Sequence, residues 1–177
     1  MTGPTGSGKS TTLCSLSDLI NRKRSEHVIT IEDPIEFVHQ NKQCIITQRQ
    51  VGVHTGSSKT ALRAALREDP DIVLVGELRD LETVSIAIET AETGHLVFAT
   101  LHTTSAAGNI DRLIDQFPPD RPNAVPGMFS DSLRRESAPN RATMAWSPLV
   151  AARSLLRSVP LHAQLVRAGT AFTISSR

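Results

Sequence analysis

Residues 3–10 read Gly-Pro-Thr-Gly-Ser-Gly-Lys-Ser, and this stretch decides how the chain folds. It matches the pattern G-x-x-x-x-G-K-[ST], in which a glycine-rich turn leads from a strand into a helix. In that pattern the backbone N–H groups of the turn surround phosphate oxygens, Lys9 reaches the terminal phosphates and the Ser10 hydroxyl faces Mg²⁺. Apolar residues at helical spacing follow, which argues against a chance glycine-serine turn. The motif predicts a nucleoside triphosphate site made by Gly3, Pro4, Thr5, Gly6, Ser7, Gly8, Lys9, Ser10 and Thr11.

Beyond this motif, apolar strand-like segments alternate with helical segments. Residues 71–75, Asp-Ile-Val-Leu-Val, form an apolar run typical of a strand buried on both faces. Such alternation predicts an α/β fold, with a mostly parallel sheet flanked by helices. We expect the strand that normally feeds the phosphate loop to be missing. Strands are expected at 27–31, 44–47 (in a hairpin-like excursion), 71–75 and 95–101, and helices from the loop to about 21–22, at 58–68, at 81–93 and at 105–116.

Two acidic positions follow predicted strands, at the edge where ligands of open α/β sheets bind. Glu77 comes two residues after the 71–75 run, where a carboxylate can hold Mg²⁺ through water or orient a water that attacks phosphate. Glu32, Asp33 and Glu36 follow the 27–31 segment, and a cation would relieve their mutual repulsion. A helix-capping acid and a solvated acidic turn are the structural alternatives. Glu77, Glu32 and Glu36 are candidate catalytic residues, and Ser10 and Glu77 are candidate Mg²⁺ ligands, partly through water.

Two histidines bracket the predicted strand at 95–101. Their spacing of seven residues places His95 and His102 at opposite ends of that strand, so they cannot share one metal ion. His102, at the carboxyl end, is a further candidate catalytic residue that could sense the γ-phosphate. His95 is expected to pack locally or to face a neighbouring subunit.

The composition restricts the remaining classes of function. Aromatic residues make up 3% of the chain and the formal net charge is +1, which argues against direct nucleic-acid binding. The two cysteines, Cys14 and Cys44, are expected to be free thiols, and no C-x-x-C pair offers a zinc site. No apolar run reaches the length of a membrane span.

Four motifs together resemble the secretion and pilus ATPases, which are hexameric RecA-like motors of type II secretion and type IV pili. These are the phosphate loop, the acidic segment 32–36, the segment 66–80 ending in Gly-Glu-Leu-Arg-Asp, and the histidine segment 95–102. The resemblance implies ATP and Mg²⁺ as cofactors, with phosphate and metal held by Lys9 and Ser10. It also implies that Glu77 is catalytic, that Glu32 and Glu36 support metal or water, and that His102 couples nucleotide state to motion.

Within this family the chain looks most similar to the branch that retracts pili in twitching motility. Residues 32–39, 61–70 and 91–98 follow that branch, and the chain lacks the four-cysteine element usual in pilus-assembly and type II secretion members. The resemblance implies a homo-hexameric ring, an inner-membrane pilus platform protein as partner, and a cytoplasmic location at the inner membrane. A truncated relic or accessory subunit without hydrolysis is the alternative.

The resemblance also suggests how the chain is divided. It is strong over residues 2–134, which we expect to form an ATPase core lacking its N-terminal part. Residues 135–149 match nothing expected there, which suggests a disordered or frame-shifted segment. From residue 150 the family pattern returns, so residues 150–177 are expected to be the last strand and helix of the same domain.

Overall fold

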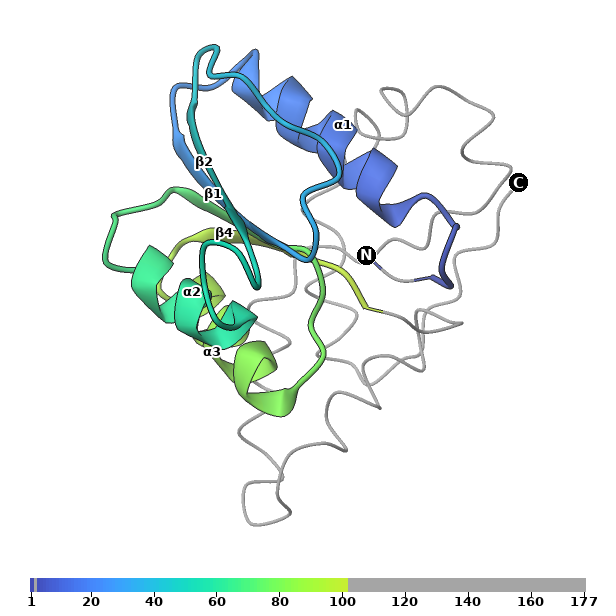
Figure 1. Cartoon of the computed structure of the whole chain (residues 1–177). Helices are drawn as coiled ribbons and strands as arrows, with labels where there is room; N and C mark the ends of the chain where they lie inside the picture. The colour runs from blue at the N-terminus through green and yellow to red at the C-terminus, as the bar shows by residue number, and fades with distance from the viewer. Residues whose placement is uncertain (2, 102–177) are drawn as a thin grey trace, which may run out of the picture.

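The computed structural model describes residue 1 and residues 3–101 of the 177-residue chain. Within this part, helices and strands are interspersed, with two strands in succession between the first two helices (Figure 1). The elements are α1 (Lys9–Asn21), β1 (His27–Glu32), β2 (Ile45–Gln50), α2 (Ser58–Ala65), β3 (Ile72–Val75), α3 (Leu81–Glu92) and β4 (Leu96–Ala99). The strands form one sheet in the order β2-β1-β3-β4, and every neighbouring pair is parallel. The prediction of a parallel α/β fold is confirmed.

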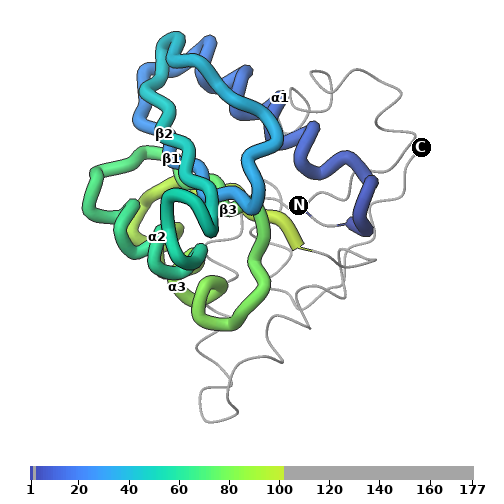
Figure 2. The backbone as a smooth tube through the Cα atoms, in the orientation of Figure 1, coloured from blue at the N-terminus to red at the C-terminus, as the bar shows by residue number. Residues whose placement is uncertain are grey.

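The second strand corrects one prediction. Its expected place in a hairpin-like excursion is wrong, because β2 runs parallel to β1, with His27 opposite Ile45 and Glu32 opposite Gln50. Parallel neighbours need a crossover connection. Residues 33–44 provide it by passing alongside α1, where the Gln43 N–H donates to the Asn21 carbonyl oxygen (2.9 Å). Figure 2 shows this crossover as the arch between β1 and β2.

The sheet has helices on both faces, with α1 on one and α2 and α3 on the other (Figure 1). Alternate residues of β3 explain the continuous apolar run. Ile72 and Leu74 join the α1 side of the core, while Val73 and Val75 join the α2 and α3 side. All four are at most 6% exposed, so β3 is the buried central strand that its sequence predicts.

Two of the helices begin with side-chain caps. The Ser57 hydroxyl accepts a hydrogen bond from the Thr60 N–H and starts α2, and the Asp80 carboxylate accepts one from the Thr83 N–H and starts α3. These caps satisfy N–H groups that have no partner within the helix. The cap of α3 follows Glu77 by three residues, so it also fixes the turn that carries this candidate residue.

Several predictions concern residues beyond 101. The expected helix at 105–116, His102, and the segments 135–149 and 150–177 all lie outside the described residues. Within residues 1–101, apart from Thr2, no helix has both the length and the apolar character that a membrane crossing requires.

Candidate functional site

The glycine-rich loop runs directly into α1, and its backbone shape depends on glycine. Gly6 and Gly8 have φ values of 77° and 89°, in the left-handed region that residues with a Cβ avoid. Gly8 is the N-cap of α1, and this helix has neither a side-chain cap nor an acid in its first turn. The start of α1, unlike that of α2 or α3, therefore presents N–H groups and a positive dipole end to the loop. This arrangement favours an anion such as phosphate.

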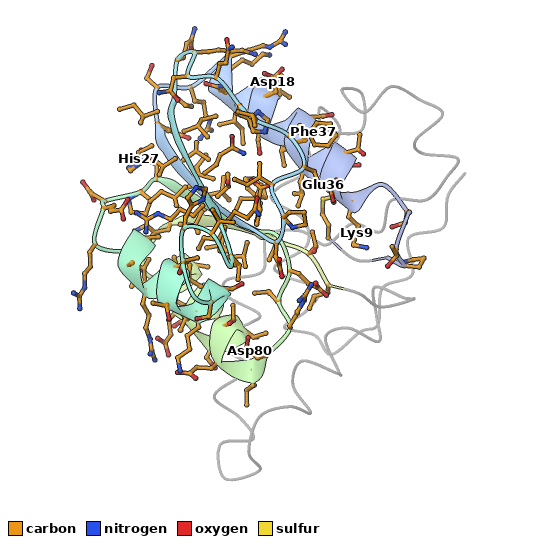
Figure 3. The ribbon with its side chains drawn as sticks, viewed as in Figure 1. Lys9, Asp18, His27, Glu36, Phe37 and Asp80 are labelled. Atoms are coloured by element: carbon orange, nitrogen blue, oxygen red, sulfur yellow. The ribbon has the colours of Figure 1, made fainter. Side chains whose placement is uncertain are left out.

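Lys9 is the first residue of α1, and its side chain lies against the loop (Figure 3). The residue is only 7% exposed. Its ammonium donates hydrogen bonds to the carbonyl oxygens of Gly3 (2.7 Å) and Pro4 (3.0 Å). Burial lowers the pKa of Lys9, and the Glu77 carboxylate partly opposes this by raising it. The fold thus places a cation within the loop and a carboxylate close enough to act on it.

Glu77 lies just after β3, at the carboxyl edge of the sheet, as the sequence predicts. Its Oε2 is 2.5 Å from Arg79 Nε, and Arg79 Nη1 is 3.3 Å from Asp33 Oδ2. Arg79 therefore joins the turn after β3 to the acidic segment after β1. A pocket of about 200 Å³ beside this cluster is lined by Ile31, Asp33, Ser57, Ser58, Lys59, Glu77, Arg79 and Asp80.

The three acids of the 32–36 segment have three different partners. Glu36 Oε1 accepts a hydrogen bond from the Ser10 hydroxyl at 3.0 Å, and Figure 3 shows Glu36 near the Lys9 end of α1. Glu32 Oε1 accepts a hydrogen bond from the Thr30 hydroxyl at 2.7 Å, while Asp33 forms a salt bridge with Arg79. Across the part of the chain that the structure describes, no three His, Cys, Asp or Glu side chains gather to hold a metal ion. The structure brings Glu36 and Ser10 together, while one oxygen of Glu32 is bound by Thr30 and Gln48.

The structure describes one of the two candidate histidines, His95. His95 lies at the amino end of β4, where its Nδ1 is 3.0 Å from the Thr93 hydroxyl and 3.1 Å from the Thr90 carbonyl oxygen. It packs against the end of α3, at the sheet edge opposite to Glu77. His102 lies outside the described residues, so its role stays a prediction.

Two amides that hold the crossover segment 33–44 were not recognised from the sequence. Asn21, at the end of α1, is fully buried, and its Oδ1 accepts from the Lys42 N–H (3.0 Å) and the Cys44 N–H (3.3 Å). Gln48, on β2, binds both Glu32 and the crossover segment. The one sequence signal was a pair of glutamines, Gln48 and Gln50, two residues apart and hence on the same face of a strand.

The loop residues fit a bound phosphate chain. The start of α1 is uncapped, Lys9 is buried beside it, and Ser7 Oγ is buried without a hydrogen-bond partner among the described residues. Ser10 and Glu36 supply hydroxyl and carboxylate oxygens at the same end of α1, the donor type that Mg²⁺ prefers. These side chains fit a nucleotide with its metal ion.

The parallel sheet, the helices on both faces and the phosphate loop at the start of α1 define a RecA-like P-loop NTPase domain. The family model described as type II/IV secretion system protein matches residues 1–118. The chain belongs to this family.

Known relatives agree with that assignment. The chain is 51% identical over 167 residues to the type IV pilus retraction ATPase PilT of Pseudomonas aeruginosa, covering 94% of this chain and 48% of the relative. It is 49% identical to a twitching motility protein of Neisseria gonorrhoeae over 177 residues, covering 99% and 47%. A crystal structure of the pilus retraction motor PilT with bound ADP superposes with a TM-score of 0.76 and 41% identity, covering 98% of this chain and 57% of that one. The chain spans about half the length of the curated relatives it matches.

Proposed function

We propose that this chain carries the motor domain of a pilus retraction ATPase, which hydrolyses ATP to power retraction of type IV pili in twitching motility. The observation that carries the proposal is the buried Lys9 ammonium within the glycine loop, close enough to Glu77 for that carboxylate to act on its pKa. The similarity to PilT, including the ADP-bound structure, supports both the nucleotide and the pilus assignment.

In this proposal the chain provides positioning and charge rather than covalent chemistry. The N–H groups of residues 6–10 and the Lys9 ammonium would neutralise phosphate oxygens, and the ammonium would exchange its bonds to Gly3 and Pro4 for bonds to phosphate. Glu77 would orient the attacking water, with Arg79 holding one of its oxygens. Glu32 and Glu36 would support the metal or the water, and His102 would report the nucleotide state.

Mg²⁺ is the metal that the site would hold, through Ser10 and, partly by way of water, Glu77. When bound it would neutralise charge on the β- and γ-phosphates. The hydrogen bond from Ser10 to Glu36 supports this assignment, because it leaves the lone pairs of the Ser10 hydroxyl oxygen able to face a cation.

We propose a homo-hexameric ring that acts on an inner-membrane pilus platform protein from the cytoplasmic side. We also propose that residues 1–134 form the ATPase core and that residues 150–177 complete the same domain, separated by a divergent segment at 135–149. A role in type II secretion or pilus assembly is the less favoured alternative, because two relatives matched over nearly the whole chain are named for pilus retraction and twitching motility.

The test compares Lys9→Ala with the wild-type chain, and Lys23→Ala serves as the control because Lys23 is an exposed lysine near the other end of α1. Binding of a fluorescent ADP analogue should weaken by about 10- to 100-fold in Lys9→Ala, since charge-assisted hydrogen bonds contribute about 1.5–3 kcal/mol. Lys23→Ala should bind normally. Equal binding by all three proteins would refute the phosphate site.

A second measurement separates the motor from a subunit that binds nucleotide without turnover. Phosphate release from ATP is followed together with size-exclusion chromatography. Hydrolysis in a hexamer supports the motor. A monomer that binds nucleotide and releases no phosphate would identify an accessory or relic subunit instead.

A further inference from the structure

The crossover segment 33–44 carries Glu36, and Gln48 on β2 holds the middle of this segment. Gln48 Nε2 donates hydrogen bonds to the Phe37 carbonyl oxygen at 2.9 Å and to Glu32 Oε1 at 3.0 Å. Gln48 Oε1 accepts a hydrogen bond from the His39 N–H at 2.7 Å. One carboxamide therefore binds the backbone just after Glu36 on two sides and, in addition, the carboxylate at the end of β1.

The rest of the segment is anchored separately. At its beginning, the Ile35 N–H donates to Gln50 Oε1 at 3.2 Å. At its far end, Asn21 Nδ2 donates to the Gln40 carbonyl oxygen at 2.7 Å, and Lys42 pairs with Asp18 of α1. Between these two anchors, Gln48 provides the side-chain hydrogen bonds to Phe37 and His39 that are seen in the described part of the chain. Glu36 directly precedes these residues in the chain.

We propose that Gln48 is a positioning residue of the nucleotide site, which presents Glu36 to the Ser10 hydroxyl by fixing Phe37, His39 and Glu32. The inference rests on the proposed function, because Ser10 and Glu36 belong to the Mg²⁺ side of that site. It adds a residue on a different strand from the phosphate loop and from Glu77.

The chemistry of the carboxamide explains why glutamine is needed at this position. A carboxamide both donates and accepts, and here the donor faces a carbonyl and a carboxylate while the acceptor faces an N–H group. A glutamate in its place would offer no donor when ionised and would put a second negative charge about 3 Å from Glu32. A methionine would keep the approximate size and lose all of these hydrogen bonds.

Glu32 and Glu36 have different roles in this arrangement. Glu32 Oε1 already accepts from both Thr30 and Gln48, so this oxygen acts within the protein. Glu36 is exposed, and Ser10 is its hydrogen-bond partner on α1. Gln48 thus links the crossover segment to Glu32 at the end of β1. Glu36 of the same segment contacts Ser10.

The first experiment uses hydrogen exchange on the full chain without nucleotide. In Gln48→Met the His39 amide should exchange about tenfold faster than in wild type, the factor expected for loss of one net hydrogen bond. Gln43→Met is the matched control, because Gln43 is an exposed glutamine of the same segment. Unchanged exchange at His39 in Gln48→Met would overturn the proposal. Gln48→Leu repeats the test if the methionine variant does not unfold cooperatively, because leucine also offers no acceptor to the His39 N–H.

The second experiment measures the Kd of a fluorescent ADP analogue with and without Mg²⁺. Gln48→Met should resemble Ser10→Ala: its Mg²⁺-free affinity should stay within about twofold of wild type, while its gain in affinity on adding Mg²⁺ shrinks at least about threefold. A full Mg²⁺ response in Gln48→Met would overturn the inference while leaving the phosphate site in place. If wild type itself does not bind the analogue, the proposed function fails, and the exchange experiment alone decides whether Gln48 positions the segment.

Discussion

The side-chain cap of α3 predicts how much the free energy of unfolding should fall in Asp80→Ala. Asp80 Oδ1 accepts from the Thr83 N–H at 2.8 Å, and Oδ2 accepts from the Thr83 hydroxyl at 2.7 Å. Thr83 is fully buried, so removing the carboxylate takes away the partner of a buried hydroxyl. Losing the cap costs about 1 kcal/mol, and leaving the hydroxyl unsatisfied costs about 1–3 kcal/mol. The free energy of unfolding should fall by about 2–4 kcal/mol in total.

The assay is urea denaturation followed by circular dichroism, with Asp80→Asn as the control. The asparagine Oδ1 can still accept from the Thr83 N–H, and its NH₂ group can donate to the Thr83 hydroxyl, so the loss should be about 1 kcal/mol or less. If Asp80→Ala loses no more stability than Asp80→Asn, the cap geometry is not what stabilises α3, and the reasoning is refuted.

The same carboxylate gives the effect a pH dependence. The hydrogen bond from the Thr83 backbone N–H lowers the pKa of Asp80, and the Thr83 hydroxyl adds to this. Because the folded pKa lies below the unfolded value of about 3.9, the contribution is fully present above that value. It is lost as the pH falls through the folded pKa. The stability difference between wild type and Asp80→Asn should therefore be constant near neutral pH and shrink below about pH 4.

Two further predictions concern the turn after β3. Glu77→Gln keeps an oxygen that can accept from Arg79, so ADP binding should persist while ATP turnover falls by about 10²- to 10⁴-fold; phosphate release measures this, and undiminished turnover would remove Glu77 from its assigned role. Gly76→Ala would place a Cβ 3.2 Å from the Ile31 carbonyl oxygen and 3.3 Å from Glu32 Cα, and the crowding should cost about 1–3 kcal/mol, seen as a lower Tm; an unchanged Tm would show that β1 and β3 can separate there.

The candidate site was only partly predictable from the sequence, and Glu32 and Glu36 show why. Both follow a predicted strand, and both lie at the carboxyl edge of the sheet as that pattern predicts. Their partners could not be derived in this way. Glu36 meets Ser10 across 26 positions of the chain, and Glu32 meets Gln48 across 16. Such pairs depend on which strand lies beside β1 and on the course of the crossover between them.

The strand 45–50 shows the same limit for the fold. Its apolar beginning indicated a strand, and the structure has one at Ile45–Gln50. Its direction could not be predicted, because the hydrophobic pattern of a segment indicates which face is buried. The pattern does not indicate whether the neighbouring strand is parallel or antiparallel. The direction is set by residues 33–44, which Asn21 holds against the end of α1.

By itself, the sequence determined the phosphate loop, the buried strand 72–75 and the place of Glu77 after it. These features are local: a left-handed turn needs glycine at Gly6 and Gly8, and a strand covered on both faces needs a continuous apolar run. Only the tertiary structure decided the strand order β2-β1-β3-β4, the contact of Arg79 with Asp33 and the hold of Gln48 on the segment that carries Glu36. Those contacts join residues far apart in the chain, and packing of α1 and the crossover against the sheet brings them together.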